Sequence, residues 1–181
     1  MINKFVVAIL KAFEKFTNDD YYIKQIDHNH ERVHYGDYFE FHDYITDLDN
    51  EANKVYLFKT GAKEVHATLA AAAIGEVKAD IYEDATITAD GTEATPINMN
   101  RTSTKTAETG IFKDPTVSDN GNLIISRYLL GSTTFISRVK TDIKQGLERI
   151  YKPNTNYLII FTAQEDNCQI LLDGEFYEKE V

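Results

Sequence analysis

Four histidines lie close together near the start of the chain, in the stretch DHNHERVHYGDYFEFH at residues 27–42. They are four of the five histidines in the sequence, namely His28, His30, His34 and His42. On a β-strand, His28 and His30 would project from the same face, and His34 would join them if the strand continued. Two imidazoles at this spacing, together with a third ligand, can hold Zn, Fe or Ni. The pattern is therefore compatible with a metal site on a strand.

Cupin enzymes carry such a His-x-His pair on a β-barrel, which makes a cupin-like metalloprotein one alternative. In the cupin pattern a glutamate follows the second histidine by four or five residues, and here those positions hold His34 and Tyr35. The remaining histidine is His66, so no second histidine motif follows. The other interpretation is a strand whose histidines are solvent-exposed beside Asp27 and Arg32, and it leads us to expect no metal and no other cofactor.

Other catalytic patterns are missing from the sequence. It contains no Gly-x-Ser-x-Gly elbow, phosphate-binding loop or dinucleotide fingerprint. The acidic stretches at residues 43–52 and 81–91 lack the spaced acidic loop with a central glycine that calcium sites use. Cys168 alternates with Ile170 and Leu172, which predicts a buried thiol rather than a nucleophile. We therefore expect a protein without enzymatic activity.

Alternation with a period of two dominates the chain after its first sixty residues. Apolar and polar side chains alternate in KEVHATLAAAAIG, EVKADIYED, NYLIIFTA and CQILLDGEFYE, a pattern typical of strands half buried on a sheet. Turn dipeptides punctuate these runs at Asp90-Gly91, Asn120-Gly121 and Asp173-Gly174. The sequence predicts an all-β protein, with a two-layer antiparallel β-sandwich of jelly-roll-like type over residues 21–181.

The N-terminal stretch MINKFVVAILKAFEKF follows a helical period instead. Its large apolar residues recur every three or four positions and would form one stripe, consisting of Ile2, Phe5, Ile9, Phe13 and Phe16. The uninterrupted apolar run is too short for a membrane span and has no signal-peptide cleavage site. We predict a short amphipathic helix within residues 1–20. Its stripe either covers the sandwich of its own subunit or docks on a partner or on another copy.

Composition limits the partners. The chain of 181 residues has 19 basic and 29 acidic residues, a formal charge of −10, and a pI near 4.9. Such a surface repels phosphate backbones, so we expect no binding to nucleic acid, and we expect no membrane association. A single cysteine excludes an intrachain disulfide and fits assembly in a reducing cytoplasm. The length is that of one domain with one sizeable core.

Residues 86–109 form a polar, threonine-rich segment that we expect at the surface. It is either an ordinary connection of loops and weak strands or a contact loop, because loops on rigid sandwiches often carry recognition. Within it, PINMNRTS concentrates amide and guanidinium groups at Asn98, Asn100 and Arg101. These groups either satisfy backbone groups of the loop, with Arg101 pairing to an acidic neighbour, or they bind a ligand.

An ordered series of phrases runs from about Val33 to the end of the chain. They are VHYGDYFEF, KEVHATLAAAAIGEVKADIYEDATITADGTEATPINMNRTS, GIFKDPTVSDNGNL, KPNTNYLIIFTAQEDN and the closing FYE. In their order and spacing these phrases resemble a group of small virion structural proteins of tailed bacteriophages. The resemblance covers about four fifths of the chain and leaves the N-terminal stripe unmatched.

The resemblance implies a β-sandwich protein that decorates or stabilises a capsid, or forms a head or tail appendage, and it implies no catalytic residues. We expect a capsid decoration (auxiliary head) protein that is assembled in the host cytoplasm and located on the virion surface. Its partners would be the major capsid protein or other virion proteins, with a possible homo-oligomer. The alternative is a head or tail fibre component that binds a host glycan through aromatic platforms at Tyr21, Tyr22, Tyr35 and Tyr38.

Overall fold

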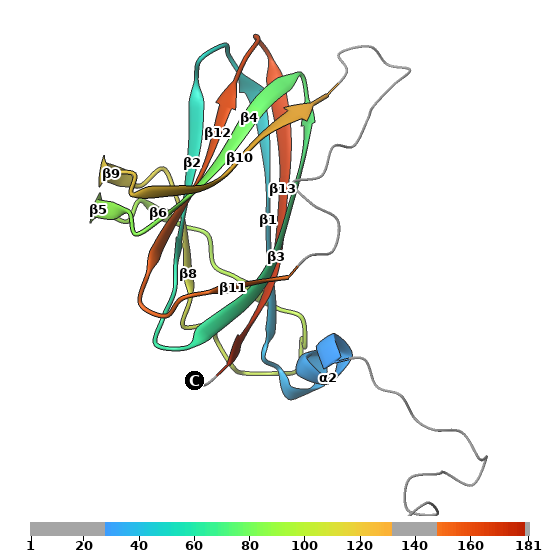
Figure 1. The fold of residues 1–181 in the computed structure, drawn as a ribbon. Helices are drawn as coiled ribbons and strands as arrows, with labels where there is room; N and C mark the ends of the chain where they lie inside the picture. Colours follow the sequence, from blue (N-terminus) through green and yellow to red (C-terminus); the bar gives the residue numbers. More distant parts are fainter. Residues whose placement is uncertain (1–27, 132–147, 180–181) are drawn as a thin grey trace, which may run out of the picture. The chain divides into compact units, whose positions relative to one another are not determined.

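The computed structural model describes residues 28–131 and 148–179 (Figure 1). The chain divides into two units, residues 1–31 and residues 32–181, and the sandwich belongs to the second unit. One helix, α2 (His28–Tyr35), comes before the first strand in the sequence. The predicted N-terminal helix and its stripe, which consists of Ile2, Phe5, Ile9, Phe13 and Phe16, lie outside the described residues.

Two antiparallel sheets make up the sandwich. One has the strand order β11-β3-β13-β1-β7, and the other has the order β10-β4-β12-β2-β8-β6. The strands of the first sheet are β1 (Tyr38–Leu48), β3 (Glu64–Ile74), β7 (Ile97–Asn98), β11 (Arg149–Tyr151) and β13 (Cys168–Lys179). Those of the second are β2 (Asn53–Lys59), β4 (Glu76–Glu83), β6 (Thr92–Glu93), β8 (Gly110–Lys113), β10 (Asn122–Leu130) and β12 (Asn156–Ala163). A separate pair consists of β5 (Thr86–Ala89) and β9 (Thr116–Asp119).

Eight of these strands follow the connectivity of a jelly roll. Along the chain they are β1, β2, β3, β4, β10, β11, β12 and β13. They divide into the four-strand orders β1-β13-β3-β11 and β2-β12-β4-β10, which is the double-sheet arrangement of that fold. The prediction of an all-β, jelly-roll-like sandwich is therefore confirmed.

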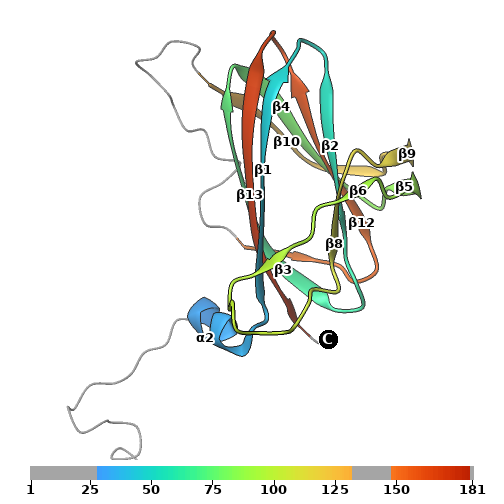
Figure 2. The ribbon, with the colours of Figure 1, turned by 180° about the vertical axis from the view of Figure 1, so that it is seen from behind.

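The remaining strands come from a single insertion between β4 and β10. This insertion contributes β7 to the free side of β1, and it contributes β8 and β6 to the free side of β2. Its other two strands, β5 and β9, pair with each other and project to one side of the sandwich (Figures 1 and 2). The threonine-rich segment at residues 86–109 belongs to this insertion and is mostly exposed, as the sequence predicts.

The core between the sheets is rich in aromatic side chains. Phe176 of β13 stacks on Phe39 of β1 with ring centroids 5.5 Å apart, and meets Phe58 of β2 edge to face at 5.6 Å. All three side chains are buried, and burying such rings dominates the energetics of a small core. The alternation of the sequence provides these contacts, because every second residue of β13 from Cys168 to Phe176 faces inward. The buried position predicted for Cys168 is confirmed.

A second, smaller apolar cluster lies on the other face of the six-stranded sheet. Leu57 and Leu158 are fully buried there, although they alternate with the side chains that face the main core. Ile87 of β5 and Val117 of β9 pack against this cluster. The insertion thus converts an outer sheet face into a second buried layer, which explains why β12 is apolar on both of its faces.

Two of the three predicted turn dipeptides are two-residue connections between consecutive strands, β5 to β6 and β9 to β10. Gly91 and Gly121 have φ angles of 90° and 78°, in the left-handed region that glycine tolerates. The third prediction, Asp173-Gly174, is wrong, because both residues lie inside β13. Gly174 is opposite Phe41 in the ladder, and a Cβ atom at this position would come within 2.1 Å of the Phe41 ring. The glycine makes room for a neighbouring ring instead of forming a turn.

Candidate binding surface

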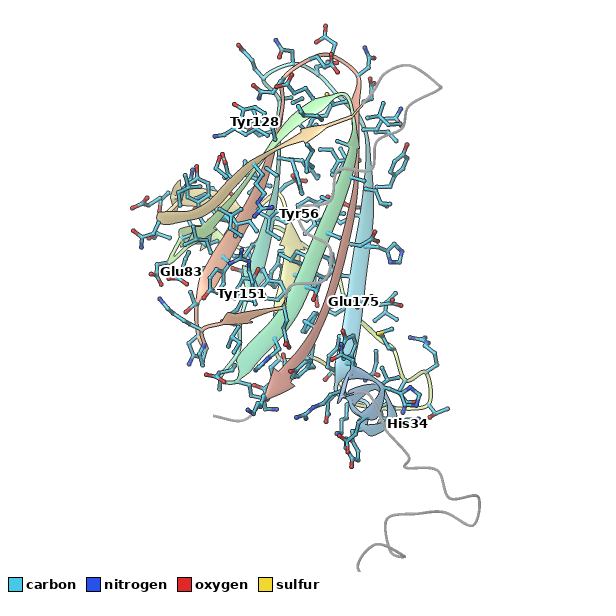
Figure 3. The ribbon with its side chains drawn as sticks, turned by 45° about the vertical axis from the view of Figure 1, so that its right-hand side comes forward. His34, Tyr56, Glu83, Tyr128, Tyr151 and Glu175 are labelled. Carbon is cyan, nitrogen blue, oxygen red and sulfur yellow. The ribbon has the colours of Figure 1, made fainter. Side chains whose placement is uncertain are left out.

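Strand β10 carries a group of exposed apolar side chains. In its sequence NLIISRYLL only Ile125 and Leu129 are buried. Four large apolar residues are 43–57% exposed, namely Leu123, Ile124, Tyr128 and Leu130 (Tyr128 is labelled in Figure 3). The only charged side chain of the strand is Arg127. Sequence reasoning missed this surface, although the lack of alternation in Leu123-Ile124-Ile125 is a signal that could have revealed it.

The position of β10 makes its exposed side chains significant. It is the end strand of the six-stranded sheet, and among the described residues it pairs with β4 alone. The other end strands of the two sheets, β6, β7 and β11, are only two or three residues long, whereas β10 has nine residues. Short edge strands are one way in which proteins avoid pairing with other chains. A register shift between Leu123 and Ile125 restricts a regular edge to the stretch from Ile125 onward.

The histidine cluster does not form the strand that the sequence predicts. Residues 28–35 are helical in α2, and residues two positions apart in a helix do not share a face. His30 and His34 are exposed, and His42 is exposed on β1 opposite Asp173. The part of the chain that the structure describes contains no group of three His, Cys, Asp or Glu side chains able to hold a metal ion. The strand-based metal interpretation of His28, His30 and His34 is therefore wrong in its geometry.

The fifth histidine, His66 of β3, makes specific contacts with neighbouring side chains. Its Nδ1 atom lies 2.9 Å from Oε1 of Glu148 and 3.0 Å from the hydroxyl of Tyr177. Its ring stacks on the Tyr177 ring with centroids 4.7 Å apart, and its Nε2 atom is buried without a hydrogen-bond partner in the described part of the chain. Burial, followed by the hydrogen bond to Glu148, raises the pKa of Tyr177 to about 12. The cluster links β3 and β13 to Glu148, the residue before β11.

Three buried tyrosines donate hydrogen bonds to carboxylates. Tyr56 bonds to Asp43 at 2.6 Å, Tyr157 to Glu83 at 3.0 Å, and Tyr38 to Glu175 at 3.2 Å. Figure 3 labels Tyr56, Glu83 and Glu175. Asp43 also forms an ion pair with Lys113, and Glu83 forms one with Lys152. Each of these two carboxylates is thus neutralised and oriented locally, which is typical of structural cross-links.

The amide groups of the PINMNRTS segment satisfy backbone groups, as one of the two interpretations expects. Asn98 donates from Nδ2 to the carbonyls of Gly36 and Lys105, at 2.8 and 3.1 Å. Asn100 accepts from the amide of Thr102 and donates to the carbonyl of His34. The hydrogen bond that the structure gives for Arg101 goes to the backbone of Asn98 rather than to an acidic side chain. These residues hold the loop in place.

The aromatic platform expected for glycan binding is only partly present. Tyr35 is 59% exposed, but Tyr38 is 6% exposed and stacks on Tyr177, so it offers no platform. Tyr21 and Tyr22 lie outside the described residues. The expectation that Tyr38 is a surface platform is therefore wrong.

Comparison of the chain with protein families, with curated proteins and with solved structures gives no match. Among the described residues no helix has both the length and the apolar character needed to cross a membrane. The surface of the molecule itself is therefore the basis on which its function can be inferred.

Proposed function

We propose that this chain is a non-enzymatic virion structural protein that decorates a phage capsid, and that the edge strand β10 is its contact with the shell. The single observation that carries the proposal is the combination found in β10, a long end strand that bears exposed Leu123, Ile124, Tyr128 and Leu130. Such a strand favours association, because its exposed apolar side chains add buried area at a contact.

The rest of the sandwich supports the same contact. The insertion adds β8 and β6 beyond β2, so β10 is the long end strand of the six-stranded sheet. The partner would present a complementary apolar surface of a neighbouring subunit. Jelly rolls occur in capsid proteins, although a fold alone does not specify a function. Many weak contacts of this kind can hold a shell, because copies anchored at several sites act at high effective concentration.

The test is co-sedimentation with heads of the phage that encodes the chain, prepared from a mutant that lacks this gene. Tyr128→Lys and Leu123→Lys place charges on the exposed side chains of β10 without touching buried residues. Leu171→Lys on β13 is the matched control, since Leu171 is a similarly exposed apolar residue (40% exposed) on the other sheet. We expect about tenfold weaker head binding for each β10 variant, equivalent to about 1.4 kcal/mol, and unchanged binding for the control.

Two results would overturn the proposal. The first is a purified chain that does not bind the heads at all, or a gene that is not carried by a phage. The second is equal loss of binding by the control and by the β10 variants, which would show that the effect is not specific to this edge. Circular dichroism of each variant verifies that it is folded.

The predicted N-terminal stripe remains a separate candidate contact. Deletion of residues 1–16 removes Ile2, Phe5, Ile9, Phe13 and Phe16 and leaves every residue of the described core in place. We expect the shortened chain to fold and to bind heads weakly or not at all. Unchanged head binding would place the contact elsewhere, and loss of folding would show that the stripe belongs to the core.

A further inference from the structure

One end of the sandwich contains a cavity of about 560 Å³. Its wall is built by Arg32 of α2, the start of β1, the residue before β3, the end of β13 and the loop around Lys105. Phe39, which is 3% exposed, contributes an apolar part of the lining. A volume of this size is in the range of small-molecule sites rather than of single-ion sites.

The charge of this cavity is opposite to that of the whole chain. It is lined by the cationic side chains Arg32, Lys63, Lys105 and Lys179, and by two acidic ones, Asp37 and Glu178. The chain as a whole carries a formal charge of −10. A concave site with low-dielectric walls focuses the field of its own charges, so an excess of cations here attracts anions despite the net charge.

Both acidic residues of the cavity are already engaged. Asp37 pairs with Lys105, whose Nζ atom is 2.6 Å from Oδ1. Glu178 accepts the backbone N–H groups of Glu108 and Thr109, at 3.1 and 2.7 Å, so each of its oxygens has a donor. These carboxylates fix the surrounding loop. Lys63 is likewise paired, with its Nζ atom 2.7 Å from Oε1 of Glu108.

Two of the cations have no acidic partner within residues 28–131 and 148–179. Arg32 lies with its Cζ atom 5.2 Å from the centroid of the Tyr177 ring, a cation–π contact. Lys179 ends β13 and is exposed, and no ion pair holds its ammonium group in the described residues. A cation–π contact uses none of the N–H donors of a guanidinium group in a hydrogen bond to an acid, so these donors can make the paired hydrogen bonds that a planar oxyanion accepts.

We propose that this cavity binds a small organic molecule that carries a carboxylate or phosphate group, with Arg32 and Lys179 as the contacts to the anion. Phe39 and the stems of Lys63 and Lys105 would contact the uncharged part of the molecule. The site is independent of the β10 edge, and it uses none of the side chains of the proposed capsid contact.

Isothermal titration with three probes of similar size tests the site. Glucuronate carries a carboxylate, glucose 6-phosphate carries a phosphate, and glucose carries neither. We expect saturable binding of at least one anionic probe at one molecule per chain, no binding of glucose, and weakening as the salt concentration rises. Whichever of glucuronate and glucose 6-phosphate binds more tightly identifies the anionic group.

Matched variants separate the site from a general effect of charge. Arg32→Gln combined with Lys179→Gln removes two positive charges from the cavity. Arg149→Gln combined with Lys59→Gln removes two positive charges from β11 and β2, outside the cavity. We expect the cavity variant to weaken binding at least about tenfold and the control variant to leave it within about twofold.

Two results would overturn the inference. Anionic probes that bind no better than glucose would show that the cavity does not select an anion. Equal weakening by the two double variants would show that only net charge matters. Lys179→Gln alone, at an exposed strand end, provides a variant that is expected to fold if the double variant does not.

Discussion

The rings of Tyr151 and Tyr157 meet edge to face with centroids 4.7 Å apart, but their hydroxyl groups have opposite environments. The hydroxyl of Tyr157 accepts the backbone N–H of Lys152 at 2.9 Å and donates to Glu83 at 3.0 Å. The hydroxyl of Tyr151 is buried and has no hydrogen-bond partner among the residues that the structure describes. Comparing these two adjacent tyrosines therefore shows how much a buried hydroxyl contributes to stability with and without hydrogen-bond partners.

Removing each hydroxyl should have opposite effects on stability. Tyr157→Phe leaves the backbone N–H of Lys152 and the Glu83 carboxylate without a partner, so we expect a loss of about 1–2 kcal/mol. Tyr151→Phe removes a polar group that is buried without compensation, so we expect no loss, or a gain of up to about 1 kcal/mol. Urea denaturation of the two variants measures both values. Equal destabilisation by both substitutions would contradict the assigned environments.

Tyr151 also contributes to the pH dependence of stability at high pH. Burial raises the pKa of Tyr151 from the ordinary value of 10.0 to about 12. A phenol with a raised folded-state pKa stabilises the fold fully below pH 10.0, and this contribution is lost as the pH rises from 10.0 through about 12. We expect the free energy of unfolding to decrease over this range, and to decrease less in Tyr151→Phe. Denaturation curves at stepwise higher pH give the slope, and identical slopes for the two proteins would refute the expectation.

Gly174 should not tolerate a side chain. A Cβ atom there would lie 2.1 Å from the Phe41 ring, so the ring or the strand must move. We expect Gly174→Ala to cost about 1–3 kcal/mol, as overpacking of a core does, even though alanine is otherwise the better strand residue. Asp173→Ala, at the exposed neighbouring position, is the control and should change stability by less than about 0.5 kcal/mol. Replacing the Phe41 ring with the smaller leucine side chain in Phe41→Leu should reduce the loss of stability caused by Gly174→Ala.

The sequence predicts the sheets well because alternation is a local signal. Val65 and Ala67 of β3, like Ile170 and Leu172 of β13, are buried at the positions where the period of two places them. The same signal explains the error at residues 28–35. This stretch is polar, with Val33 as its one aliphatic residue, so neither a strand period nor a helical period can be read from it.

Other features depend on contacts between distant residues and leave little trace in the sequence. Gly174 looks like part of a turn until Phe41, more than 130 positions earlier in the chain, is placed opposite it. The basic cavity combines side chains from α2, from the residue before β3, from a loop and from the end of β13, each of which is unremarkable in its own segment. The edge position of β10 depends on where the insertion adds its strands, which alternation cannot show.

Acid should weaken the fold through carboxylates that accept hydrogen bonds. Burial opposes the ionisation of Asp43, but hydrogen bonds from Lys113 and Tyr56 outweigh it and lower the pKa of this carboxyl below the ordinary value of 3.8. A group with a depressed folded-state pKa stabilises the fold above its ordinary value, and that stabilisation is lost as the pH falls through the folded value. We therefore expect the free energy of unfolding to decrease as the pH falls from about 5 to below 3.

Asp43→Asn isolates this contribution. The variant cannot ionise at position 43, so its stability should be lower than that of the unmodified chain near pH 6, and the difference should shrink as the pH approaches 3. Asp49→Asn is the control, because Asp49 is exposed and its side chain has no ion pair among the described residues. Denaturation in urea at a series of pH values measures the difference. A gap between Asp43→Asn and the unmodified chain that stays constant with pH would mean that Lys113 and Tyr56 do not stabilise the ionised form of Asp43.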